Sequence, residues 1–87
     1  MKYYIISIER TKGAEEGAIN EYITTEKVAD EKTALTKHYT KCANVSNALG
    51  TTHYYADIRI VNSLGGVIKK DVIGTYVEDT PTPEPTE

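Results

Sequence analysis

The 87-residue chain contains no tryptophan or phenylalanine and only one cysteine, Cys42. A single cysteine excludes intramolecular disulfides and argues for a reducing compartment. Together with only two histidines, His38 and His53, it also falls short of a four-ligand structural zinc site, so we expect no metal and no cofactor.

A chain this short buries only about 60% of its unfolded surface. Self-association is the remaining common source of stability, and we expect a homo-oligomer.

Long hydrophobic runs are also missing, and no segment is apolar enough to cross a membrane. The N-terminal stretch MKYYIISIER superficially resembles a signal peptide, but Ser7 and Glu9 interrupt its apolar run. We therefore interpret it as a strand and expect a cytoplasmic protein.

Charge of one sign is lacking over most of the chain. The net charge is −3, and Asp79, Glu84 and Glu87 lie within the last nine residues. The other ten acidic side chains balance ten basic ones, so residues 1–78 have no general footprint for duplex nucleic acid. A small anionic ligand needs only a few local cations and remains compatible with this composition.

Hydrophobic periodicity predicts an α+β fold of order ββαββ. One amphipathic helix would follow an N-cap at Asp30 and cover one face of a four-stranded antiparallel sheet. We expect residues 1–78 to form a single domain and the acidic, proline-rich residues 79–87 to form a disordered tail. The predicted strands span residues 2–10, 18–28, 52–62 and 67–77, and the predicted helix spans residues 31–44.

Within these elements, helical spacing predicts that Leu35, Tyr39 and Cys42 pack into the core, with His38 at the core edge. Gly65 and Gly66 are typical of a tight hairpin turn. Gly74 interrupts the last strand and indicates a bulge or a close backbone approach.

The stretch THYYADIRIV, residues 52–61, alternates between two kinds of side chain. One set is plain core (Tyr54, Ala56, Ile58 and Ile60), and the other mixes polar, charged and aromatic groups (His53, Tyr55, Asp57, Arg59 and Val61). We expect the second set to lie on the uncovered sheet face, together with Tyr3 and Ile5. Such a face is too apolar to stay exposed, so it should pack against another copy or line a pocket formed with one.

No standard catalytic or phosphate-loop motif is present. Arg59, Lys69 and Lys70 are candidates for holding phosphates, Tyr54 or Tyr55 for stacking on a base, and His53 or Asp57 for a hydroxyl contact. The simpler alternatives are a surface ion pair beside a solvated histidine and an edge strand that lysines protect from aggregation.

Four segments carry a family resemblance: the KYY strand in Met1–Arg10, EYITT at Glu21–Thr25, the AL…H helix core at Ala34–His38, and GVIK at Gly66–Lys69. With them, the body of the chain resembles short proteins of phages and prophages of gut Firmicutes. The helix departs from the pattern at His38 and Tyr39, where a bulky apolar residue is usual.

Small phage proteins of this kind include Sequestin-like sponges, which are oligomers that bind nucleotide immune signals at chain interfaces. The resemblance implies a phage-encoded anti-defence protein of the host cytoplasm that sequesters a cyclic ADP-ribose-type or cyclic oligonucleotide signal. We expect no enzymatic activity, because the sequence shows no paired acid–base set. The alternatives are a phage accessory or structural protein that binds another protein, and an enzyme that cleaves a nucleotide signal with His38 or His53.

Overall fold

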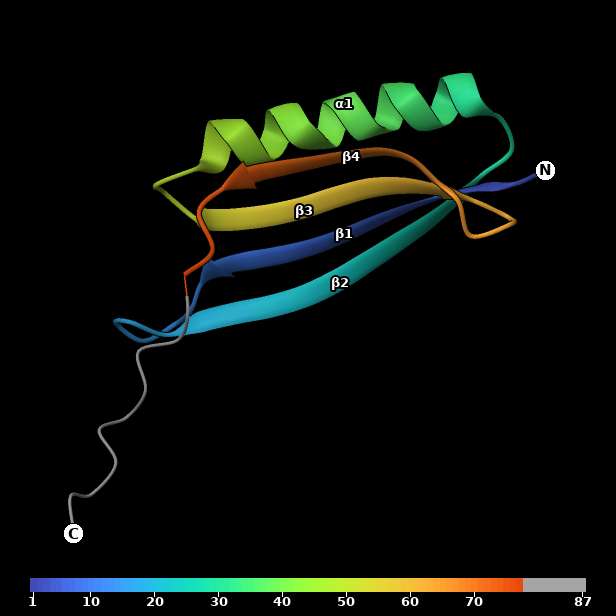
Figure 1. Cartoon of the computed structure of the whole chain (residues 1–87). Coiled ribbons are helices and arrows are strands. Elements are labelled where there is room, and N and C mark those ends of the chain that lie inside the picture. The colour runs from blue at the N-terminus through green and yellow to red at the C-terminus, as the bar shows by residue number, and fades with distance from the viewer. Residues whose placement is uncertain (78–87) are drawn as a thin grey trace, which may run out of the picture.

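The computed structural model describes residues 1–77, and the predicted tail, residues 79–87, lies outside the described residues. The predicted ββαββ order, with one antiparallel sheet and one helix, is confirmed (Figure 1). Its elements are β1 (Tyr3–Lys12), β2 (Ile19–Val28), α1 (Glu31–Ala48), β3 (His53–Asn62) and β4 (Val67–Gly74).

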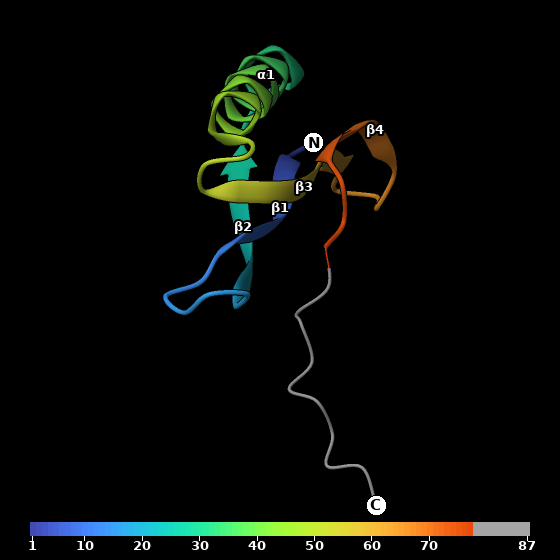
Figure 2. The same cartoon turned by 90° about the vertical axis from the view of Figure 1, so that its left-hand side faces the viewer.

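All neighbouring strands in the sheet are antiparallel, in the order β2-β1-β3-β4. The first and third strands are therefore central, and β2 and β4 form the edges. Viewed at 90° to Figure 1, α1 lies to one side of the twisted sheet (Figure 2). In the described part of the chain no element covers the other side, and we call the two sides the covered face and the open face.

Strict alternation along the central strands builds the core on the covered face. In β3, Ala56, Ile58 and Ile60 have no exposed surface, and Ile5 of β1 retains 7%. The predicted core set of β3 is thus correct for these three side chains. The prediction that Tyr3 and Ile5 lie on the open face is wrong, because they are paired with Asn62 and Ile60 and so share the core side of β3.

The helix begins at the predicted cap, where an Asp30 carboxylate oxygen accepts a hydrogen bond from the Thr33 backbone N–H at 2.8 Å. It runs four residues beyond the predicted end, to Ala48, and so buries Val45. Its inward face is Ala34, His38 and Val45, with Leu35 and Cys42 partly buried. The prediction that Tyr39 is core is wrong because it is 54% exposed, and His38 is fully buried rather than at the core edge.

Each end of β3 carries a register shift. Arg10 pairs with Tyr55 but Thr11 pairs with His53, so Tyr54 is an extra residue in β3. The backbone of Gly74 approaches this bulge closely: a Cβ there would lie 2.3 Å from the Tyr54 carbonyl oxygen, and its φ is 79°. The close approach predicted at Gly74 is therefore confirmed.

Candidate functional site

An ionic cluster occupies the centre of the open face. Arg59 Nε and Nη2 donate to the two carboxylate oxygens of Asp57 at 3.0 and 2.8 Å, in a bidentate arrangement within one strand. Lys70 lies opposite Arg59 on β4, and its Nζ is 3.7 Å from the same carboxylate. Two cations thus face one carboxylate, which leaves the cluster with a net positive charge.

The carboxylate of this cluster is the buried member. The Asp57 side chain is only 10% exposed, whereas those of Arg59 and Lys70 are 32% and 49% exposed. The Arg59 hydrogen bonds, aided by the charges of Arg59 and Lys70 and opposed by burial, lower the pKa of Asp57. The arrangement holds both cations at the surface, where an anionic group from solution can reach them.

Aromatic rings adjoin this cluster on the same face. Tyr55 lies two residues before Asp57 and makes an edge-on contact with Tyr76, with ring centroids 5.5 Å apart. The Arg10 guanidinium lies 4.3 Å from the Tyr76 ring centroid. Arg10 also donates to the Val77 carbonyl at 2.7 Å and pairs with Glu21 of β2. These contacts fix residues 76 and 77 against the end of the sheet.

Apolar side chains complete the open face on both flanks. Ile8 on β1 pairs with Ile23 on β2, and Asp57 on β3 pairs with Val72 on β4. Ile23 is 63% exposed and Val72 is 52% exposed. The face therefore combines an apolar surround with a central charged cluster and an aromatic end.

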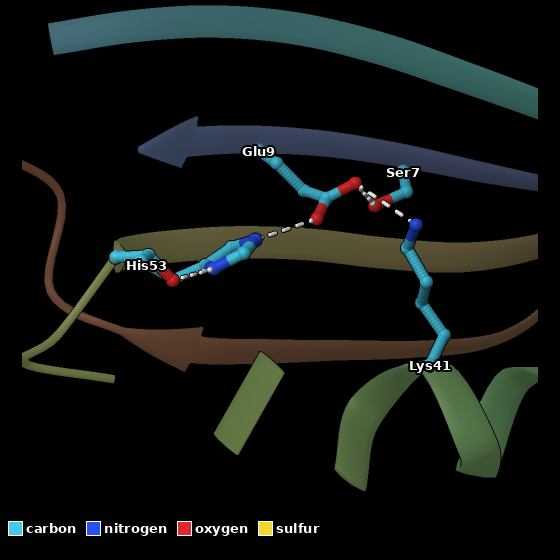
Figure 3. A network of polar contacts seen from close by, with 5 residues as sticks. Ser7, Glu9, Lys41 and His53 are labelled. Carbon is cyan, nitrogen blue, oxygen red and sulfur yellow. Dashed lines mark hydrogen bonds and ion pairs between the residues drawn. The ribbon is translucent and has the colours of Figure 1, made fainter. Parts of the chain in front are cut away.

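A second polar network lies under the helix, on the covered face (Figure 3). The Glu9 side chain is only 3% exposed. Its carboxylate accepts from Ser7 Oγ at 3.1 Å, pairs with Lys41 Nζ at 3.0 Å and contacts His53 Nε2 at 3.0 Å. Burial alone would raise the pKa of Glu9, but these partners outweigh it and lower the pKa.

Beside this network, the helix and β2 leave a groove of about 180 Å³. Two of its lysines are already paired: Lys37 Nζ lies 2.6 Å from Glu26, and Lys41 is held by Glu9. An anion entering the groove would have to displace a carboxylate at either lysine. The groove is lined by Ile5, Ser7, Thr24, Thr25, Glu26, Lys37 and Lys41.

A third cluster joins α1 to β4. His38 Nε2 lies 2.7 Å from Asp71 Oδ2, and Lys69 Nζ lies 3.5 Å from the same oxygen and 5.4 Å from the Tyr39 ring centroid. Cys42 is one helical turn beyond His38. Burial and, to a smaller extent, the negative charge of Asp71 raise the pKa of its thiol, which favours the protonated form.

The structure separates the predicted ligand-binding residues into two groups. Tyr55, Asp57, Arg59 and Lys70 lie together on the open face. Lys69 contacts the helix on the covered face, and Tyr54 lies at the bulge, where its carbonyl accepts from the Thr75 N–H at 3.2 Å.

His53 joins the covered-face group. The prediction that it shares a face with Asp57 and Arg59 is wrong, because the extra residue Tyr54 reverses the alternation and turns His53 towards Glu9. Sequence reasoning also missed the roles of Glu9, Lys41 and Tyr76. The sequence holds one signal for the Glu9 network, because Ser7 and Glu9 are polar residues on the same side of β1 as the apolar Ile5.

In comparisons with known proteins, the chain matches no family model, no curated protein and no solved structure. Within residues 1–77, α1 is too polar to be a membrane-spanning helix.

Proposed function

We propose that this chain is a non-enzymatic binding protein that retains a small nucleotide signal on its open face, beneath a second copy of itself. The observation that supports it is the placement of Tyr55, Arg59 and Lys70 on the same uncovered face, with Arg59 and Lys70 paired across strands. The resemblance to phage sponges supplies the ligand class, a cyclic ADP-ribose-type or cyclic oligonucleotide molecule, and the setting of anti-defence in the host cytoplasm.

Each part of such a ligand has a counterpart on this face. Arg59 keeps donor capacity beyond its two bonds to Asp57, and Lys70 is half exposed, so the two can share a phosphate. The Tyr55 and Tyr76 rings offer a surface for a base, and base–aromatic stacking contributes about 1–3 kcal/mol. Asp57 can accept from a ribose hydroxyl. His53 and Lys69 have no part in this version, because they lie on the covered face.

The second copy follows from the apolar surround. Ile23 and Val72 are more than half exposed on either side of the charged cluster, and a small domain gains stability by burying such a surface. A covering subunit would also remove water from the ligand, which strengthens the ionic contacts. Retention, rather than turnover, would then be the mechanism.

The test is to incubate the protein with ADP-ribose, cyclic ADP-ribose isomers and cyclic di- and trinucleotides. Melting temperature would be followed first, and the ligand would be recovered after heating. A ligand at 100 times its Kd should add about 2.7 kcal/mol of stability. Intact ligand released by denaturation supports sequestration, whereas a chemically altered ligand supports the enzyme alternative.

Two adjacent lysines provide a matched pair of variants. Lys70→Ala should weaken binding of the responding nucleotide about tenfold or more, because Lys70 lies on the open face. Lys69→Ala should bind it normally, because Lys69 contacts Tyr39 and Asp71 on the covered face. Equal losses in both variants would contradict the assignment to the open face.

A protein partner is the alternative occupant, favoured by the exposed Ile23 and Val72. Ile23→Asp should dissociate the assembly in sedimentation experiments, whereas Leu64→Asp, at the 82% exposed tip of the β3–β4 turn, should not. A monomeric wild-type protein that shifts with no nucleotide in the panel would overturn the proposal and favour a phage accessory protein acting through protein contacts.

A further inference from the structure

His38, Cys42 and Asp71 bring three different metal-binding side chains to one place between α1 and β4. One ligand atom from each, a ring nitrogen, the thiol sulfur and a carboxylate oxygen, lies within 4.8 Å of the other two. His38 and Cys42 are four residues apart on one helix, so they project from the same side in successive turns. Asp71 reaches them from the facing side of β4.

The burial of His38 is the unusual feature of this cluster. Its side chain has no exposed surface, and its Nδ1 has no hydrogen-bond partner within residues 1–77. A buried polar group without a partner costs free energy, and a leucine or methionine would fill the same position without that cost. Among residues 1–77, Asp71 is the one polar partner of the ring, through Nε2 at 2.7 Å.

We propose that His38, Cys42 and Asp71 form a binding site for one divalent transition-metal ion, best suited to Zn²⁺. Nitrogen, sulfur and oxygen donors of this kind are the usual zinc set, with bonds of about 2.0–2.3 Å. Small side-chain rotations of Cys42 and Asp71 would bring the three donors to tetrahedral spacing around such an ion. Water would fill the fourth position, since the Asp71 side chain is 40% exposed to solvent.

The site would join the helix to an edge strand. Beside this cluster, Lys69 of β4 lies 5.4 Å from the Tyr39 ring centroid of α1, and Ile73 of β4 packs against the core. A metal ion bonded to both elements would act as the cross-link that a chain with one cysteine cannot obtain from disulfides. Binding would release the Cys42 thiol proton to solvent and move the proton between His38 Nε2 and Asp71 to Nδ1, so that Nε2 can take the metal. It would also replace the contact between Lys69 and Asp71.

The test starts from metal-free, reduced protein titrated with Co²⁺ and then with Zn²⁺. We expect one Co²⁺ per chain, with the visible bands of a tetrahedral centre and a sulfur-to-cobalt charge-transfer band. Zn²⁺ should displace the Co²⁺ and abolish both sets of bands. Zn²⁺ should also raise the melting temperature. Absence of stoichiometric binding, or an octahedral spectrum without the sulfur band, would overturn the proposal.

Variants at the partly exposed ligands avoid the risk that a change at buried His38 prevents folding. Cys42→Ser should abolish the sulfur band and weaken Zn²⁺ binding by more than about 100-fold, which exceeds the usual effect of losing an outer-shell partner. Asp71→Asn should weaken it by about 10-fold or more. His53→Gln, which removes the other histidine, should leave metal binding unchanged, and loss of binding in this variant alone would overturn the assignment.

A substitution of Lys69 distinguishes a metal-binding site from a cluster that has only a structural role. The Lys69 ammonium lies 3.5 Å from the Asp71 oxygen and would repel a metal ion there. Lys69→Gln should therefore bind Zn²⁺ several-fold more tightly than the wild-type protein. Unchanged or weaker binding in Lys69→Gln would contradict direct coordination by Asp71.

Discussion

The two faces of the sheet use charged residues in opposite ways. On the covered face, Glu9 is buried and each of its carboxylate oxygens has a protein partner. On the open face, Asp57 is similarly buried, but its partners Arg59 and Lys70 reach the surface. The Glu9 carboxylate has its partners between the helix and the sheet and so joins the two. The Asp57 carboxylate instead holds two cations at the surface, where a ligand can reach them.

The largest expected difference between the faces concerns their isoleucines. Ile58→Ala removes a fully buried side chain from the covered face and should lower the free energy of unfolding by about 2–5 kcal/mol. Ile23→Ala, on the open face, should change it by no more than about 0.5 kcal/mol at concentrations where the protein is monomeric. Urea denaturation measures both, and equal losses in the monomer would mean that the open face is already covered within one chain.

The next comparison tests the covered-face network. Glu9→Gln keeps the shape of the side chain but removes its charge, and should lower the free energy of unfolding by about 1–3 kcal/mol. Glu26→Gln is the control, because Glu26 also pairs with a helix lysine but both side chains are about half exposed. Its effect should stay within about 0.5 kcal/mol. If the two losses were alike, burial of Glu9 would not be what gives its network strength.

The smallest expected effect is the pH dependence of the open-face cluster. Because the pKa of Asp57 is lowered in the folded state, its contribution to stability is present above the pKa of an unfolded aspartate, about 3.9. That contribution is lost as the pH falls through the lower, folded value. Asp57→Asn should therefore be less stable than the wild-type protein at pH 6, and the difference should narrow in acid. A difference that is constant from pH 6 to strongly acidic solution would contradict the lowered pKa.

The fold could be predicted from the sequence because its signals are local and repeated. Alternation in ADIRIV identifies the core side of β3, and Asp30 identifies the start of the helix. The stretch KYYIISIER predicts a strand but has apolar residues on both sides, so its core side was assigned wrongly. The end of the helix was harder to predict, since the Asn and Gly signals at residues 44–50 overlap the last turn, where Val45 packs into the core.

The candidate site was only partly predictable, for a different reason. Lys69 and Lys70 are adjacent, so alternation alone should place them on opposite faces, as the structure does. Whether His53 lies on the same face as Asp57 depends on the register shift at Tyr54, which no local sequence pattern indicates. The pairing of His38 with Asp71 joins residues 33 positions apart, and only the packing of α1 on β4 brings them together.

The extra residue at Tyr54 has a consequence for how this chain can vary. The side chains on either side of it point to opposite faces of the sheet, so His53 contacts Glu9 while Tyr55 contacts Tyr76. Deleting Tyr54 would make the pairing with β1 regular and leave His53 and Tyr55 on their present, opposite faces, whereas a regular strand that kept Tyr54 would bring both side chains to one face. The contacts of His53 and Tyr55 at this end of the sheet therefore depend on the bulge as well as on the identity of the two residues.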